Sequence, residues 1–179
     1  MTGSGPRIRL AEVDDAERLA EILVRSWTAT YRGIMPDPVL DRLSVADRTA
    51  RWRTSIRDAA SDDALRRWVV LDDRTIQGYA ITGPGQDDFL PAPPGSGELD
   101  SLYLHPDAMG RGLGRALFAH ALDDLRARGF HPLVLWAFEA NAHARRFYET
   151  AGFEHDADST WTLEGVPVPV VRYRFAASR

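Results

Sequence analysis

Three glycines at alternate positions, Gly110, Gly112 and Gly114, lie where a strand-like segment gives way to a helix-like one. Residues 102–105 before them read Leu-Tyr-Leu-His, and the residues after them carry leucine and alanine at helical spacing. Glycine lets successive amides turn toward one point, and the first turn of a helix leaves its N–H groups free. A tight turn alone would need only one glycine. The run therefore predicts a backbone cradle for a pyrophosphate between a strand and a helix.

Two common phosphate-binding motifs do not fit this run. A dinucleotide fingerprint that begins at Gly110 needs a small residue at position 115, where this chain has Arg115. A Walker loop needs a lysine, and all 22 basic residues are arginine. We expect Arg111 and Arg115 to add charge-assisted contacts to phosphate oxygens.

The segments around the glycines follow the order β-α-α-β-β-β-α-β-α-β-β, which predicts a mixed α/β fold. A strand, the glycine-started helix and the next strand should form a parallel, right-handed unit at its centre. Residues 1–6 are expected to be a disordered lead-in, and residues 7–179 have the length of one domain. The expected strands are 8–11, 68–71, 76–81, 98–105, 132–136, one from 153 onward and 166–175, and the expected helices begin near 14, 36, 112 and 141.

Two of these segments carry further expectations. Strict alternation in 98–105 puts Glu98 and Asp100 on the same face as the two leucines of the Leu-Tyr-Leu run. Prolines in 166–175 favour an edge strand. The last two strands hold much apolar surface, which either burial within the monomer or a homodimer would explain. Its carriers are Trp161, Val166, Val168, Val170 and Val171.

Composition excludes several classes of protein. The chain has no cysteine, so disulfides, thiolate metal sites and a cysteine nucleophile are absent. A net charge of −4 argues against a nucleic-acid surface. No apolar run is long enough to span a bilayer, and no signal peptide precedes the first strand, so we expect a cytoplasmic protein without a membrane partner. His105 and His143 have no second ligand at a metal-binding spacing, so no metal is expected.

Two segments resemble the GCN5-related N-acetyltransferases, or GNAT family. Residues 102–107 with the Gly-x-Gly-x-Gly helix start resemble motif A of that family, and residues 140–153 resemble its motif B. The order and spacing of elements match the family from Ile8 onward. The family usually has glutamine or arginine where this chain has Met109, which weakens one side-chain contact.

The resemblance implies a mixed sheet of about seven strands whose fourth and fifth strands splay apart. It also implies that the pantetheine arm of acetyl-CoA, the co-substrate, lies in that opening and pairs with the backbone of Leu102 and Leu104. The pyrophosphate would sit on the amides of residues 110–115. The expected cofactor-binding residues are Leu102, Tyr103, Leu104, Met109, Gly110, Arg111, Gly112, Leu113, Gly114, Arg115, Asn141 and Tyr148.

Without a cysteine, direct transfer to an amine requires a base for the amine and an acid for the leaving thiolate. Glu98 is the candidate base, because the family often has a glutamate there that acts through water; Asp100 is the second candidate. Tyr148 is the candidate acid. It lies seven residues after Asn141, so two helical turns put both on one face. The alternatives are an exposed strand-end acid for Glu98 and a core aromatic ring for Tyr148.

By the same resemblance, Trp27, Tyr31 and Arg32 lie on the acceptor side; Trp27 is also on the apolar face of its helix, so core packing is its alternative. Asp100 belongs to a group of acids that either attracts a cationic amine or is simply solvated. We expect an enzyme that acetylates a small-molecule amine. A protein acceptor would need an open groove, whereas the proline-rich loop 83–97 is expected to cover the acceptor site. Acetylation of a protein N-terminus or lysine, and a non-catalytic acyl-CoA-binding protein, are the alternatives. The acceptor itself cannot be named from the fold.

A histidine and an aspartate on the glycine-started helix have two possible roles. His120 and Asp124 form the His-x-x-x-Asp pattern that another class of CoA acyltransferases uses for catalysis. At i, i+4 the pair is also an ordinary stabilising arrangement on a helix. We expect it to be structural.

Overall fold

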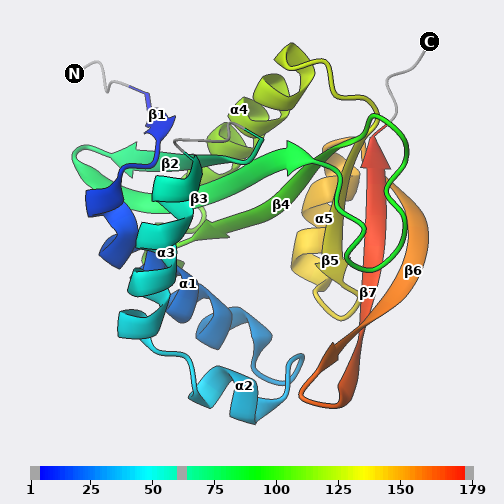
Figure 1. The fold of residues 1–179 in the computed structure, drawn as a ribbon, viewed down its shortest axis with the longest axis horizontal. Coiled ribbons are helices and arrows are strands. Elements are labelled where there is room, and N and C mark those ends of the chain that lie inside the picture. The colour runs from blue at the N-terminus through cyan, green and yellow to red at the C-terminus, as the bar shows by residue number, and fades with distance from the viewer. Residues whose placement is uncertain (1–4, 60–63, 176–179) are drawn as a thin grey trace.

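A computed structural model describes residues 5–59 and 64–175, which form a mixed seven-stranded sheet with helices on both faces (Figure 1). Residues 1–4 of the predicted lead-in lie outside the described residues. The strands are β1 Arg7–Leu10, β2 Arg66–Asp72, β3 Thr75–Pro84, β4 Gly97–Leu104, β5 Leu133–Phe138, β6 Glu154–Leu163 and β7 Val166–Phe175. The helices are α1 Ala16–Tyr31, α2 Asp37–Asp41, α3 Val45–Ala59, α4 Leu113–Ala127 and α5 Ala142–Thr150.

The strands are ordered β1-β2-β3-β4-β5-β7-β6, and β4 and β5 form the parallel pair that α4 connects. This confirms the predicted mixed α/β sheet and its central strand–helix–strand unit. The second predicted helical region is in fact two helices, because α2 ends at Asp41 and Ser44 starts a new one. The Ser44 hydroxyl accepts a hydrogen bond from the Asp47 N–H at 3.3 Å, as an N-cap does.

The prediction of an edge strand for residues 166–175 was wrong, since β7 lies between β5 and β6. The pairing of β7 with β5 ends at Val170, which lies opposite Phe138. Pro167 and Pro169 therefore lie beyond the end of β5, where no N–H is needed on that side. The apolar side chains of β7 at 168, 170 and 171 are buried in the monomer, and Val166 is exposed. Burial within the monomer therefore explains most of this surface, and a homodimer stays a prediction.

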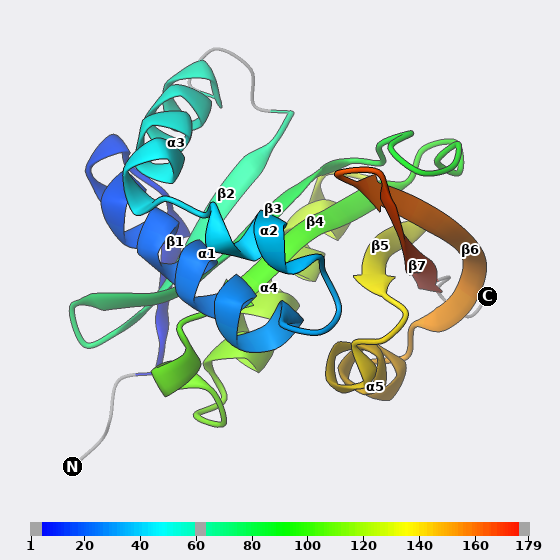
Figure 2. The ribbon, with the colours of Figure 1, turned by 90° about the horizontal axis from the view of Figure 1, so that it is seen from below.

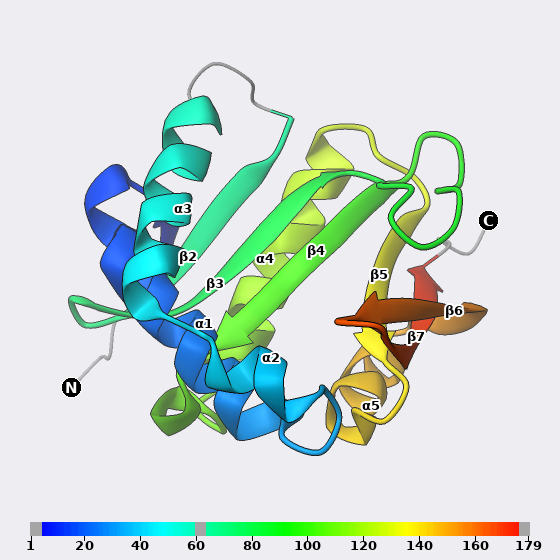
Figure 3. The same ribbon diagram turned by 60° about the horizontal axis from the view of Figure 1, so that its bottom comes forward.

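The fourth and fifth strands separate after a short common stretch. Residues 97–99 of β4 pair with residues 133–135 of β5, and beyond them the two strands diverge (Figure 3). The divergence starts at a β-bulge: Leu99 pairs with Thr82 and Ser101 with Ile81, which leaves Asp100 without a partner on β3. A bulge bends its strand and increases the local twist, so β4 turns away from β5 at this residue.

The bulge also corrects the expected alternation in β4. Leu99 belongs to the core under α4, and Leu102 and Leu104 pack against the same core. Glu98 points to the opposite face, toward α1, and so do Ser101 and the ring of Tyr103. Strict alternation would have put Glu98 with the leucines, but the extra residue shifts the facing by one position.

Helices cover the two faces unequally. In Figure 3, α1, α2 and α3 lie in front of the sheet and α4 lies behind it. Figure 2 shows α5 beside β5 and β7, next to the opening. The end of α1 and the start of α2 reach across to the separated half of the sheet, where Tyr31 and Leu40 join Phe138 in one apolar cluster. The opening is therefore bridged on one face by this segment.

Candidate active site

The glycine run forms an open concavity at the start of α4. Gly110 and Gly112 have φ of +76° and +81°, and Gly112 is the N-cap of the helix. A Cβ on either glycine would meet nothing within 4 Å, so the space before them is free. The first backbone bond of α4 runs from the Ala116 N–H to the Gly112 carbonyl at 3.1 Å. The N–H groups of residues 113–115 have no backbone partner in the described chain, and this fits a pyrophosphate.

The side chains around this cradle point in different directions. Arg111 forms an ion pair with Asp72 of β2, so it faces the sheet edge in this conformation. Arg115 lines a groove of about 580 Å³ between α4 and α5, beside His143 and Arg146. The side chain of Met109 is 52% exposed and adds no charge to the cradle.

The splayed half of β4 presents free backbone to the opening. The His105 N–H donates to the Gln77 carbonyl at 2.7 Å, which fixes the antiparallel pattern with β3. In that pattern the N–H and C=O groups of Tyr103 face β3, and those of Leu102 and Leu104 face away from it. No strand pairs with them on that side in the described chain, so they are available to an extended ligand.

A narrow cavity of about 40 Å³ lies in the opening, between β4, β5 and α5; we call it the narrow cavity. Asn141 and Tyr148 both line it, as their spacing predicts. The Asn141 carbonyl oxygen accepts the Ala144 N–H at 3.1 Å and caps α5, which leaves the amide NH2 for another partner. Tyr148 is 9% exposed, its hydroxyl has no partner among the described residues, and burial raises its pKa.

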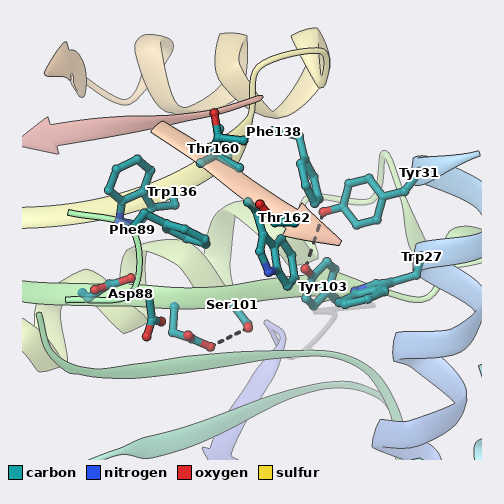
Figure 4. Close-up of a pocket in the computed structure, with 15 residues that line it drawn as sticks. Trp27, Tyr31, Asp88, Phe89, Ser101, Tyr103, Trp136, Phe138, Thr160 and Thr162 are labelled. Carbon is teal, nitrogen blue, oxygen red and sulfur yellow. Dashed lines mark hydrogen bonds between the residues drawn. The ribbon is translucent and has the colours of Figure 1, made fainter. Parts of the chain in front are cut away.

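A larger cavity of about 520 Å³ lies on the α1 face of β4; we call it the wide cavity (Figure 4). Its aromatic lining comes from α1, the 85–96 loop, β4, β5 and β6. These side chains are Trp27, Tyr31, Phe89, Tyr103, Trp136, Phe138 and Trp161. Three carboxylates also line it, and these are Asp88, Glu98 and Asp100.

Glu98 is the most buried of these carboxylates, with 4% of the residue exposed. Its carboxylate accepts the Gln86 N–H at 2.8 Å. Desolvation raises its pKa to about 7, and the charges of Asp100 and Asp88 act in the same direction. Glu98 is therefore expected to change its protonation state near neutral pH, which suits a residue that must accept a proton there.

Asp100 occupies the bulge and projects into the wide cavity. Its carboxylate accepts a hydrogen bond from the Ser101 hydroxyl at 2.7 Å. Its side chain is exposed to the cavity, yet the surrounding protein atoms still raise its pKa by desolvation. Asp100 therefore lies close to Glu98 but in a wetter environment.

The two cavities meet at the start of the splay. They share lining residues from α1, β4 and β5, among them Tyr31, Ser101 and Phe138. Glu98 belongs to the wide cavity and Tyr148 to the narrow one. The candidate base and acid thus line two different cavities that share part of their walls.

The predicted acceptor residues are only partly brought together. Trp27 and Tyr31 line the wide cavity, and the Tyr31 hydroxyl lies 3.5 Å from that of Tyr103. Arg32 does not line it, and its guanidinium instead bonds Asp37 and Asp41 at the surface. Sequence reasoning missed four aromatic residues of this wall. Phe89, Trp136, Phe138 and Trp161 stand in no motif, and only their contacts in the fold assemble them.

The His120 and Asp124 pair lies away from both cavities. The Asp124 carboxylate pairs with Arg66 at 2.5 Å and with Arg128 at 3.6 Å. The His120 ring packs on Trp68 with 4.3 Å between centroids. These contacts join α4 to β2 and hold the fold together, which agrees with a structural role.

Among the described residues, no three or more histidine, aspartate or glutamate side chains are grouped so that they could hold a metal ion. Across the same parts of the chain, the helices lack the length and hydropathy that a bilayer crossing demands.

Comparisons with known proteins agree with this geometry. A family model described as the acetyltransferase (GNAT) family matches residues 17–153. A probable N-acetyltransferase of Mycobacterium tuberculosis is 30% identical and aligns with 99% of this chain and 98% of its own length. A mycothiol acetyltransferase of Geodermatophilus obscurus is 41% identical over 66% of this chain and 45% of its own length. The solved structure of PaiA N-acetyltransferase from Thermoplasma acidophilum in complex with coenzyme A has a TM-score of 0.73, covers 96% of this chain and all of its own, and is 20% identical. This chain belongs to the GNAT acetyltransferase family.

Proposed function

We propose that this protein transfers an acetyl group from acetyl-CoA directly to the amine of a small molecule. The observation that carries the proposal is the buried Glu98 carboxylate, whose pKa of about 7 lies close to the operating pH. It lines the wide cavity, and its neighbours Asp100 and Ser101 line both cavities. The glycine cradle and the free backbone of Leu102 and Leu104 fit the phosphate and pantetheine parts of CoA, the ligand of the Thermoplasma structure.

In the proposed reaction the amine nitrogen forms a bond to the acetyl carbon as the carbon–sulfur bond breaks. Glu98, directly or through a water, accepts the proton that the amine must lose, because an alkylammonium has a pKa near 10. Asp100 and Asp88 keep the potential at this end of the cavity negative and attract the cationic amine.

Tyr148 is the proposed donor to the departing sulfur. Its raised pKa keeps the hydroxyl protonated, and no residue of the described chain competes for that proton. The same raised pKa makes complete proton loss to a thiolate costly, since a thiol titrates near pH 8.5. We therefore expect Tyr148 to stabilise the leaving sulfur mainly by a hydrogen bond.

The 85–96 loop favours a small acceptor over a protein. The Phe89 ring packs on Trp136 and Trp161, with centroids 5.0 and 6.0 Å away. The Ser159 hydroxyl donates to the Phe89 carbonyl at 3.2 Å, and Arg172 donates to the Pro91 carbonyl at 3.0 Å. The loop is thus fixed against one end of the wide cavity, where a polypeptide would need an open groove.

Initial-rate kinetics with acetyl-CoA and a panel of amines tests the proposal. Released CoA can be followed with a thiol reagent without background, because the chain has no cysteine. We expect acetylated amine and intersecting lines, which indicate a ternary complex. Parallel ping-pong lines would contradict direct transfer, and release of CoA only with peptide acceptors would favour the protein alternative. Tight acyl-CoA binding with no transfer to any acceptor would leave a non-catalytic binding protein.

A further inference from the structure

We infer that the acceptor is a primary amine joined by a short alkyl chain to a flat apolar ring, the class of the arylalkylamines. The inference rests on the proposed function and names the kind of molecule that the wide cavity selects. Two independent observations carry it: a continuous aromatic wall, and a lining that holds carboxylates at one side and no cationic side chain.

The aromatic wall is a chain of ring contacts across three elements. Phe138 and Trp161 stack with their planes 10° apart and their centroids 5.7 Å apart. Tyr31 meets Phe138 edge-on at 4.9 Å, and Trp27 meets Tyr31 edge-on at 5.9 Å. These mutual contacts hold the rings in place, so a planar ligand finds a preorganised apolar surface. An aliphatic or hydroxylated body would use this surface poorly.

The charges lie apart from the end of that wall that Trp27 and Tyr31 form. In Figure 4, Asp88 and Ser101 lie on one side of the cavity, and Tyr31 and Trp27 lie at the other end. The carboxylates come only from β4 and the 85–96 loop, whereas α1, β5 and β6 contribute rings and threonines. This arrangement receives an ammonium beside Glu98 and an uncharged ring beyond it.

The lining also disfavours other acceptors. Among the described residues that line the cavity there is no arginine, lysine or histidine. Arg48 and Arg172 stack on the rings of Trp27 and Trp136 without lining the cavity, and Arg172 is already paired with Asp156. A carboxylate on the acceptor would therefore find no counter-ion within the lining. A free amino acid or a peptide C-terminus is therefore disfavoured. A diamine would place its second ammonium against the rings, away from the three carboxylates, where cation–π attraction offsets only part of its lost hydration and no flat apolar surface is buried.

Calorimetric titration of the CoA-bound protein with matched ligands tests the inference. 2-Phenylethylamine, phenylalanine, ethylamine and putrescine share the amine and differ in ring, carboxylate or second charge. We expect 2-phenylethylamine to bind about tenfold or more tightly than each of the others, because only it buries a ring without adding a charge. Equal affinities, or tightest binding of phenylalanine or putrescine, would overturn the inference.

Variants of Trp161 locate the effect. Trp161 is on the edge strand and half-buried, so replacing it leaves the central core intact. Trp161→Leu should weaken 2-phenylethylamine about five- to tenfold and leave ethylamine unchanged, and Trp161→Phe should restore most of the loss. Val166→Ala, at an exposed position nearby, serves as the control. If Trp161→Leu weakens both amines equally or neither, the wall does not select the ring.

The same ligands separate this inference from the proposed function. Ring-selective binding without acetylation of any amine would contradict the proposed transfer and support the ring site. Acetylation of all amines with no preference for the ring would support the transfer and overturn the inference.

Discussion

The narrow and wide cavities share residues of α1, β4 and β5, yet they offer different groups to a ligand. The cradle and the β4 side of the narrow cavity offer backbone groups: free amides at the start of α4 and free groups on the splayed half of β4. The wide cavity depends on side chains from α1, β4, β5, β6 and a loop. Backbone can serve one invariant ligand over many sequences, whereas side chains can be exchanged one at a time. With the proposed assignment of the two sites, we expect cofactor recognition to tolerate substitutions and acceptor recognition to change with them.

The largest expected effect comes from filling the cradle. Gly112→Val should abolish measurable CoA binding in a calorimetric titration, because its Cβ projects into the free space in front of the amides. A left-handed φ also strains a valine, so the variant should lose stability. Gly165→Val is the matched control: Gly165 has φ of +79° and free space at the β6–β7 turn. It should lose similar stability and keep its CoA affinity, and a folded Gly112→Val that binds CoA normally would show that the phosphate site is elsewhere.

The next largest effect distinguishes Glu98 from Asp100 as the base. Glu98→Gln should lower kcat/KM by about 10²–10³-fold, within the range of general-base contributions. In the parent, Glu98 accepts protons only when ionised, so kcat/KM should rise through pH 7. The difference between parent and variant should be widest between pH 7 and about 10, since Glu98 is protonated below and the amine loses its own proton above. A larger loss in Asp100→Asn would assign the base to Asp100.

The same substitution should stabilise the protein. Glu98 has a folded-state pKa of about 7 against 4.5 when unperturbed. As pH rises from 4.5 to 7, the unfolded chain loses this proton while the folded protein keeps it, so parent stability falls. Glu98→Gln removes this loss, and we expect a gain of at most about 3 kcal/mol at pH 8 and none near pH 4. Denaturant unfolding at both pH values measures it, and an equal shift at both would contradict the linkage.

A smaller catalytic effect is expected from Tyr148, which lines the narrow cavity. Tyr148→Phe keeps the ring and removes a hydroxyl that has no partner in the described chain, so stability and CoA affinity should change little. We expect kcat to fall about 10²-fold, the lower end for an acid whose raised pKa limits it to hydrogen bonding. Tyr173→Phe is the contrast, because its hydroxyl donates to Glu149 at 2.6 Å and accepts from Arg145 at 2.9 Å. That variant should lose stability and keep its kcat; full activity in Tyr148→Phe would refute the proposed acid.

The smallest effect concerns the one motif position that departs from the family. Met109 is exposed beside the cradle. Met109→Arg should tighten CoA binding only about two- to fivefold, because an exposed charge is screened by solvent, and the gain should shrink with added salt. A gain above about a hundredfold would mean that this side chain, rather than the backbone, dominates phosphate binding.

The same comparison explains how far the sequence could predict the site. The cradle was predictable because Gly110, Gly112 and Gly114 are adjacent in sequence, and local backbone freedom is a local property. Asn141 and Tyr148 were predictable from helical spacing. The aromatic wall was not, because Phe89, Trp136 and Trp161 come from separate elements that only the fold brings together.

The faces on which the β4 side chains lie could not be predicted from the sequence either. Alternation alone placed Glu98 with the leucines, but the bulge depends on how β4 and β3 pair, which β4 by itself does not encode. The break between α2 and α3 is different, because Ser44 is a recognisable N-cap and was overlooked within one long amphipathic region. The roles of Glu98 and Tyr148 stay predictions until they are tested by the variants above.

The single unpaired residue at Asp100 has a consequence for how such a protein can be recombined or shortened. Deleting it would restore a regular ladder and rotate the segment that precedes it by half a turn about the strand axis. The Glu98 carboxylate would then enter the leucine-lined interior, and the Leu99 side chain would project into the acceptor side. A chimera of two related proteins that is joined within residues 97–101 keeps Glu98 and Leu99 on their present faces only if both parents carry the extra residue. The number of residues at this point therefore matters more for such a chimera than which residues they are.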